Sequence, residues 1–175
     1  SSDLRGATLS RDLNERHHEG SCVGNMGLAW QNLGDIDKAE ECFQEVLEIM
    51  REEGDHVREG FALASLGRVA VSREDYAKAI ELHEEHLKLN LEHGDPKGEM
   101  LALALLGETY LAAGQLKESV DRFERQLKLA KTLNDLPSEG NALGNLGRAC
   151  RQLGEPDKAA EFFTRQIDVA HTLAD

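Results

Sequence analysis

The sequence lacks the features of several protein classes. It contains no run of 18 consecutive apolar residues, so we expect no membrane insertion. Its first residues, SSDLRGATLSRD, lack the apolar core of a secretory signal peptide. Basic residues are few, since 20 Lys and Arg stand against 33 Asp and Glu, for a formal net charge of −13. Nucleic acids and anionic membranes attract basic surfaces, so we expect neither as a general partner.

Cysteines and catalytic motifs are also scarce. The three cysteines, Cys22, Cys42 and Cys150, show no close pairing. An odd, unpaired set is typical of a reducing compartment, so we expect a cytoplasmic protein in which Cys22 and Cys150 are small buried residues. The sequence has no Gly-rich phosphate loop, no G-x-S-x-G motif and no Cys–His pair of defined spacing. We therefore expect no enzyme activity, no cofactor and no metal site.

A repeat is the main feature that the sequence does contain. Four glycines stand 40 residues apart, and each follows a leucine or a methionine: Gly27, Gly67, Gly107 and Gly147. A fixed period with a shared motif indicates a repeat array. Two more positions recur in the same register, one small and one mainly aromatic: Ala39, Ala79, Ser119 and Ala159, then Phe43, His83, Phe123 and Phe163. A glycine within a helix costs roughly 1 kcal/mol relative to alanine, so its repetition indicates closely crossing helices. We expect the aromatic residues to fill the space between one helix pair and the next.

The spacing of apolar residues predicts the fold class. Intervals of 3, 4 and 7 residues recur twice in each unit, as in amphipathic helices, and no segment alternates like a strand. Gly, Asp and Pro between these stretches mark helix ends. We predict eight helices, near residues 15–33, 36–53, 56–73, 76–93, 96–113, 116–133, 136–153 and 156–173. The chain is therefore predicted to be all-α, an α-solenoid of four helix-turn-helix units.

The units divide the chain almost completely. We assign them to residues 15–54, 55–94, 95–134 and 135–175, and treat residues 1–14 as a leader or the remnant of a preceding repeat, with Leu4, Leu9 and Leu13 as its contacts. Arrays of this kind need polar caps at their ends, and no extra capping helix is recognisable. We therefore expect a piece of a longer array, or end-to-end self-association of copies.

The pattern L-G-x-x-[WY]…G…A-x-x-x-F resembles the tetratricopeptide repeat. It runs from Met26 to Phe43 and, with a serine at the alanine position, from Leu106 to Phe123. A period of 40 would also fit HEAT units, but the Gly, Ala and Phe positions fit the tetratricopeptide repeat. The long units, with G-D-x-x-x-E-G beginning at Gly54, resemble the Pins/LGN class of that family. The resemblance implies a right-handed superhelix that acts as a scaffold and holds an extended peptide on its concave face.

In this family the first helix of each unit lines the concave face, and this places the candidate binding residues. They are Asn25, Phe61, Ser65, Arg68, Leu101, Leu105, Asn141, Asn145, Arg148 and Arg151. Arginine binds carboxylates at two points, and asparagine can bond both backbone groups of an extended peptide. Phe61, Leu101, Leu105 and Leu111 form an apolar strip. We therefore expect a protein or peptide partner with acidic and apolar residues.

Other interpretations of these residues remain open. The arginines could be solvated or paired with neighbouring acids such as Glu139 or Glu155, and the apolar strip could pack on a further helix. A chaperone-type carboxylate clamp is not expected, because its positions hold Gly24, Leu28 and Ser65. A different class of function is a structural or oligomerisation segment whose inner face packs on its own chain or on another copy. Loss of acidic-peptide binding in an Arg148→Ala/Arg151→Ala variant would favour the first function.

The segment His83-Glu84-Glu85-His86 is the one motif that resembles a metal site. The zinc-protease helix needs histidines four residues apart, a glutamate beside the first, and a third ligand. Here the spacing is three, and His83 occupies the aromatic packing position, so we interpret both histidines as core residues. Two core histidines could loosen this layer when protonated near pH 6. A melting temperature that does not change between about pH 7.5 and 5.5 would contradict that hypothesis.

Overall fold

The computed structural model describes the backbone of residues 2–174 and the side chains of residues 18–174. Within that range the chain is all-helical, as predicted, and contains no strand. The eight helices are α1 (Ser2–Leu33), α2 (Ile36–Glu53), α3 (His56–Ser72), α4 (Tyr76–His93), α5 (Pro96–Ala112), α6 (Leu116–Leu133), α7 (Leu136–Gln152) and α8 (Pro156–Ala174). None of these helices is long and apolar enough to cross a membrane, as far as the described residues extend.

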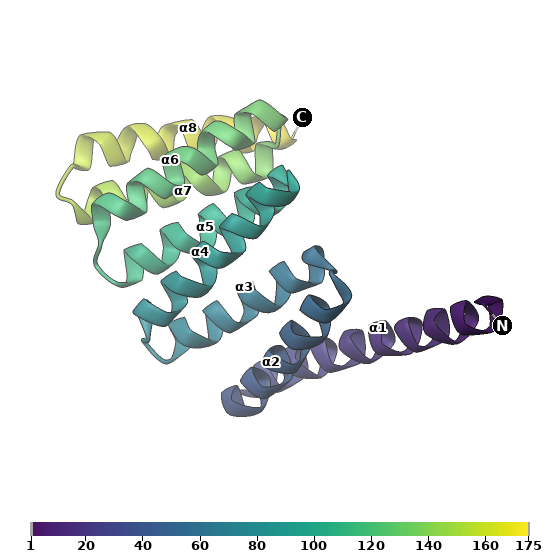
Figure 1. Cartoon of the computed structure of the whole chain (residues 1–175). Coiled ribbons are helices and arrows are strands. Elements are labelled where there is room, and N and C mark those ends of the chain that lie inside the picture. The colour runs from purple at the N-terminus through teal and green to yellow at the C-terminus, as the bar shows by residue number, and fades with distance from the viewer. Residues whose placement is uncertain (1, 175) are drawn as a thin grey trace.

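The helices stack in chain order. Each helix packs on the one before and the one after it, and α5 also contacts α3 and α7. Figure 1 shows the resulting array, which runs from α1 at one end to α8 at the other. A chain in which each unit contacts only its neighbours is an α-solenoid, so the predicted architecture of helix-turn-helix units is confirmed.

The predicted bounds of α2 to α8 agree with the structure to within one residue, whereas the start of α1 does not. The predicted start was near residue 15, but α1 begins at Ser2 and continues without a break. No Gly-Asp or proline turn separates residues 14 and 15, so nothing in the sequence ends a helix there. The contacts expected for Leu4, Leu9 and Leu13 lie outside the side chains that the structure describes. The origin of residues 1–14 stays a prediction.

Aspartates and left-handed residues separate the helices. Asp55 and Asp135 each accept a hydrogen bond from a backbone N–H of the following helix at 3.0 Å. A carboxylate at this position satisfies one of the unpaired N–H groups of a helix N-terminus. Gly54 ends α2 at φ 71°, and Asn134 ends α6 at φ 53°. These are backbone conformations that glycine and asparagine adopt most readily, which explains why the turns were recognisable in the sequence.

The motif glycines make room for aromatic rings. A Cβ added at Gly27 would lie 2.6 Å from Cε1 of Phe43, and one at Gly147 would lie 2.6 Å from Cε1 of Phe163. Such distances are far inside van der Waals contact, so the ring lies directly against the glycine backbone. The rings therefore pack against the first helix of their own unit, which corrects the expectation that they fill the space between successive pairs. Phe43 additionally reaches the next unit, where its ring centroid lies 6.1 Å from that of Phe61.

Two of the three cysteines are buried. Cys42 and Cys150 lie in the core, but Cys22 is exposed, so the expectation for Cys22 was wrong. At the equivalent position of α3, Ala62 is fully buried. Helix α3 packs between α2 and α4, whereas the described contacts of α1 are almost entirely with α2, which follows it. Cys22 therefore lacks a neighbouring helix on its own side.

Candidate functional site

Four hollows follow one another along the first helices of the units. Their volumes are about 320 Å³ between α1 and α3, about 240 Å³ between α3 and α5, about 350 Å³ beside Arg68 and Glu108, and about 470 Å³ between α5 and α7. Neighbouring hollows share side chains, since Phe61 lines the first two and Leu105 lines the last three. They form one continuous surface along α1, α3, α5 and α7, called the inner groove below.

The structure brings nearly all of the predicted site residues to this surface. The residues that line at least one hollow are Asn25, Phe61, Ser65, Arg68, Leu101, Leu105, Asn141, Asn145 and Arg148. Arg151 is exposed near the end of α7 and lines none of the four. It lies less than one helical turn after Arg148, closer to the C-terminal end of α7.

Three of the four residues of the apolar strip are at least partly open to solvent, whereas Leu111 is buried in the core, so the prediction for Leu111 was wrong. Phe61 is 40% exposed and Leu101 is 53% exposed, while Leu105 is half-buried. Within the described part of the chain no helix covers them. Large apolar side chains left uncovered in a hollow favour contact with another molecule.

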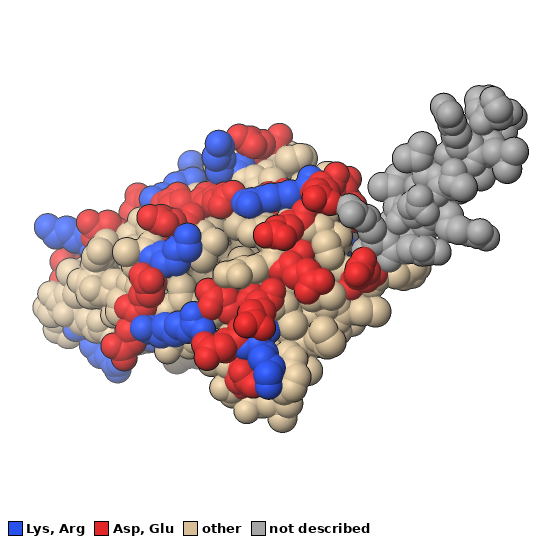
Figure 2. Space-filling view, turned by 60° about the horizontal axis from the view of Figure 1, so that its bottom comes forward, with Lys and Arg blue, Asp and Glu red and all other residues tan. Residues whose placement is uncertain are grey.

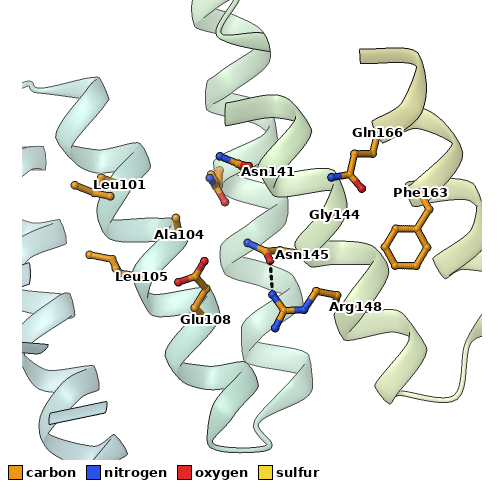
Figure 3. Close-up of a pocket in the computed structure, with 11 residues that line it drawn as sticks. Leu101, Ala104, Leu105, Glu108, Asn141, Gly144, Asn145, Arg148, Phe163 and Gln166 are labelled. Carbon is orange, nitrogen blue, oxygen red and sulfur yellow. Dashed lines mark hydrogen bonds between the residues drawn. The ribbon is translucent and has the colours of Figure 1, made fainter. Parts of the chain in front are cut away.

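Arg58, which lines the hollow between α1 and α3, pairs with Asp55 at 3.1 Å, whereas the three predicted site arginines have no acidic partner among the described residues. Arg148 donates from Nη1 to Oδ1 of Asn145 at 3.0 Å, the bond drawn in Figure 3. Among the described residues, no carboxylate lies within 4 Å of Arg68, Arg148 or Arg151.

The pairing considered as an alternative is not formed. Glu139 lies 3.6 Å from Lys131, and Glu155 lies 3.0 Å from Lys158. Both acids thus have lysine partners, and Arg68, Arg148 and Arg151 have no carboxylate partner among the described residues.

Arginines on the second helices form ion pairs with neighbouring acids. Arg51 of α2 bonds to Glu85 of α4, and Arg122 of α6 lies 2.9 Å from Glu84 of α4. These pairs join the second helices of successive units. Figure 2 shows such acidic and basic side chains lying beside one another on the surface of the array. Outside the groove, several arginines and lysines thus pair with acidic neighbours.

The sequence analysis missed a set of residues on the second helices that form the floor of the groove. They occupy one register position, and every member lines a hollow: Val46, His86, Gln126 and Gln166. They reach the hollows because the facing position of each first helix is small: Gly24, Ala64, Ala104 and Gly144. A Cβ at Gly144 would lie 2.6 Å from Nε2 of Gln166. Both 40-residue series were visible in the sequence and could have indicated this floor.

Part of this floor has unsatisfied hydrogen-bonding capacity. Oε1 of Gln126 and Nδ1 of His86 are buried and have no hydrogen-bond partner. Burying such an atom without a partner is costly. Both atoms are inaccessible to solvent, so a ligand in the groove would reach them only after the floor rearranged.

A second buried histidine lies at the edge of the groove. His83 lines the hollow beside Arg68, packs against Gly67, and is buried as predicted. Burial lowers its pKa to about 4, and the charges of His86 and Arg68 act in the same direction. Burial also lowers the pKa of His86, which Asp95 partly opposes. Protonation of His83 in the folded chain therefore occurs well below pH 6, which corrects the expected range.

The geometry suits non-covalent binding. No group of three or more His, Cys, Asp or Glu residues in the described part of the chain is arranged to hold a metal ion. Guanidinium and carboxamide groups, apolar side chains and a long open surface together match the needs of an extended segment of another protein.

Comparisons with known proteins agree on the fold. The sequence matches the family model for the tetratricopeptide repeat over residues 22–92 and 99–170. No match was found among curated proteins. Among solved structures, BtubC from P. vanneervenii superimposes with a TM-score of 0.81 at 17% identity, over 89% of this chain and 64% of BtubC.

Two further structures are similar. Aspartyl phosphate phosphatase F from Bacillus subtilis gives a TM-score of 0.85 at 17% identity, over 91% of this chain and 42% of that protein. A kinesin light chain with nearly identical TPR-like repeats from Podosopora anserina gives a TM-score of 0.73 at 21% identity, over 88% of this chain and 76% of that protein. The chain thus spans less than two thirds of BtubC and of phosphatase F, and at these identities the likeness concerns the fold. Because the family match covers most of its length, the chain belongs to the tetratricopeptide repeat family.

Proposed function

We propose that the chain is a non-catalytic interaction scaffold that binds an extended, partly acidic peptide segment of a partner protein in the inner groove. The observation that supports this most is the coincidence of two features on one surface. The groove has basic side chains without acidic partners in the described chain, and it has exposed apolar side chains beside them.

Each element of the groove would have a separate task. Arg148 and Arg68 would bind carboxylates of the partner, because a guanidinium group offers two parallel donors. Asn141 and Asn145 would bond the backbone of the segment. The three open residues of the apolar strip would take its hydrophobic side chains, and the exclusion of water there would strengthen the neighbouring polar contacts.

The finer points of the sequence analysis belong to the same proposal. A cytoplasmic location fits a peptide-binding scaffold with unpaired cysteines. Likeness to the Pins/LGN class, and a right-handed superhelix with the groove on its concave side, stay predictions. The similar structures include a phosphatase and a kinesin light chain, and nothing in the groove assigns this chain to either class.

Fluorescence anisotropy with labelled peptides tests the proposal. The probes are nine-residue peptides that combine aspartates with leucine or phenylalanine. A peptide of alternating glycine and serine is the reference. Arg148→Ala should weaken binding about tenfold, since a hydrogen bond to a charged group contributes about 1.5–3 kcal/mol. Arg151→Ala, the same change on the same helix but outside the hollows, is the matched control.

The outcomes separate three possibilities. If neither Arg68→Ala nor Arg148→Ala weakens binding while helicity stays intact, the groove is not the site. Equal losses for Arg148→Ala and Arg151→Ala would place the contact at the end of α7. If no acidic or apolar peptide binds more tightly than the reference, the proposed function fails.

Self-association is the second candidate, and α8 supplies its supporting observation. Ile167 and Leu173 of α8 are large apolar side chains that are 55% and 52% exposed. A second copy could cover them. Light scattering over a concentration series measures this directly, and Ile167→Asp should shift any dimer towards monomer. A constant monomer mass at the highest concentration would exclude it.

A further inference from the structure

We propose that the bound segment carries charges in the order acid, base, acid, which face Arg68, Glu108 and Arg148 in turn. This refinement rests on the proposed function, because it concerns the same groove. It replaces a uniformly acidic ligand by one of alternating charge.

The three side chains form a row along the groove, one on each of three successive first helices. Each follows the motif glycine of its unit by one residue, so they lie at equivalent positions of α3, α5 and α7. Arg68 and Glu108 line the same hollow of about 350 Å³. Glu108 and Arg148 line the next one, of about 470 Å³. Glu108 therefore stands between two arginines, with a hollow on either side.

The three residues of this row do not form ion pairs with one another. All three residues are exposed, yet no ion pair within 4 Å joins any of them to an opposite charge in the described chain. Figure 3 shows Glu108 on α5 and Arg148 reaching from α7 into the same space, where Arg148 bonds to Asn145 rather than to Glu108. Each charge is thus free to meet a group of the ligand.

A ligand with acids at all three places would meet a repulsive contact. Its middle carboxylate would face Glu108, and like charges brought close together oppose binding strongly enough to determine specificity. A lysine or arginine at that place would instead pair with Glu108. We expect the preference for the alternating ligand to be roughly tenfold, the effect of one close charge pair in a partly hydrated groove.

The spacing of the helices sets the spacing of the charges. Packed helices lie about 8–10 Å apart, and an extended polyproline II segment advances about 3.1 Å per residue and returns to the same side every third residue. Three residues span about 9.3 Å, so the acid, the base and the second acid should stand at positions i, i+3 and i+6.

The test uses three labelled peptides that differ only at these positions: Asp-Lys-Asp, Asp-Asp-Asp and Lys-Asp-Lys. Leucines occupy fixed positions between them. The wild type should bind Asp-Lys-Asp about tenfold more tightly than Asp-Asp-Asp, and Lys-Asp-Lys most weakly. Glu108→Arg should reverse the order of the first two peptides. Glu124→Gln, which removes an exposed acid of α6 outside the hollows, should leave all three affinities unchanged.

Two results would overturn the inference while the proposed function stands. One is equal binding of Asp-Lys-Asp and Asp-Asp-Asp by the wild type, with Arg148→Ala still weakening both. The other is a Glu108→Arg variant, folded by circular dichroism, that keeps the wild-type order. If none of the three peptides binds more tightly than a glycine-serine peptide, the proposed function fails and this refinement fails with it.

Discussion

The helix pairs α3–α4 and α5–α6, called the second and third repeats below, bury different side chains at equivalent positions. In the second repeat His83 packs against Gly67, and in the third Phe123 packs against Gly107. Both rings are fully buried. The position therefore demands a flat ring over a glycine, while the polarity of the ring is free to vary.

The difference has an energetic consequence. Nδ1 of His83 is buried without a hydrogen-bond partner, whereas the phenyl ring of Phe123 has no polar atom to satisfy. The second repeat should therefore be the weaker of the two at this position. It should also be the one that responds to pH, because its ring can be protonated.

Truncating the two rings should have the largest effect on the free energy of unfolding. Phe123→Ala should lower the free energy of unfolding by about 3–5 kcal/mol, through lost apolar contacts and a residual cavity. His83→Ala should cost about 1–3 kcal/mol less, because it also removes the unpartnered nitrogen. Urea unfolding at neutral pH measures both values. Equal losses would mean that the two rings contribute alike and would break the comparison.

Acidification should act mainly through the second repeat. The unfolded chain protonates His83 near pH 6.5, but the folded chain does so only near 4, so the unfolded state holds more protons in between. Stability must then fall as the pH drops through this window. At pH 5 the loss attributable to His83 is ~2 kcal/mol.

A phenylalanine at this position provides the comparison. The groups near His83 are Arg68 on α3 and His86 on its own helix. His83→Phe should remove most of the extra pH dependence and leave the part due to His86 and the carboxylates. His171→Gln, a change at an exposed histidine of α8, is the control. Parallel stability curves for the wild type and His83→Phe between pH 7 and about pH 5 would contradict the prediction.

The sequence predicted the features that depend on local chemistry. Helix ends were recognisable because Asp55 and Gly54 carry out their capping within a few residues. The burial of His83 followed from its register with Phe43 and Phe123. All of these follow from periodicity and backbone preference alone.

Features that depend on direction or on a neighbouring helix could not be predicted in this way. Arg148 and Arg151 looked alike in the sequence, yet Arg148 lines a hollow while Arg151, in the last turn of α7, does not. Gln126 belongs to a second helix and reaches the groove because Ala104 on the facing helix is small. The start of α1 was missed because no turn residue marks it.

A hydrogen bond also distinguishes the two repeats, with a smaller expected effect on the free energy of unfolding. Oγ of Ser119 donates to the carbonyl oxygen of Gly107 at 2.8 Å in the core, whereas the second repeat has Ala79 at that position. Ser119→Ala should cost about 1 kcal/mol, the usual net contribution of such a bond. The reverse change, Ala79→Ser, should raise the free energy of unfolding by less than about 1 kcal/mol if the carbonyl oxygen of Gly67 is not placed to accept the bond. A gain of stability in Ser119→Ala, measured by thermal unfolding, would show that the bond is not formed.

The smallest effect should come from the ion pair that joins the two repeats. Arg122 of α6 lies 2.9 Å from Glu84 of α4, and both side chains are partly exposed. Such pairs contribute about 0.2–1 kcal/mol and weaken as salt is added. A double-mutant cycle of Arg122→Gln and Glu84→Gln isolates their coupling. If that coupling exceeds the loss in Ser119→Ala and persists in about 1 M salt, charge rather than core packing holds the second and third repeats together.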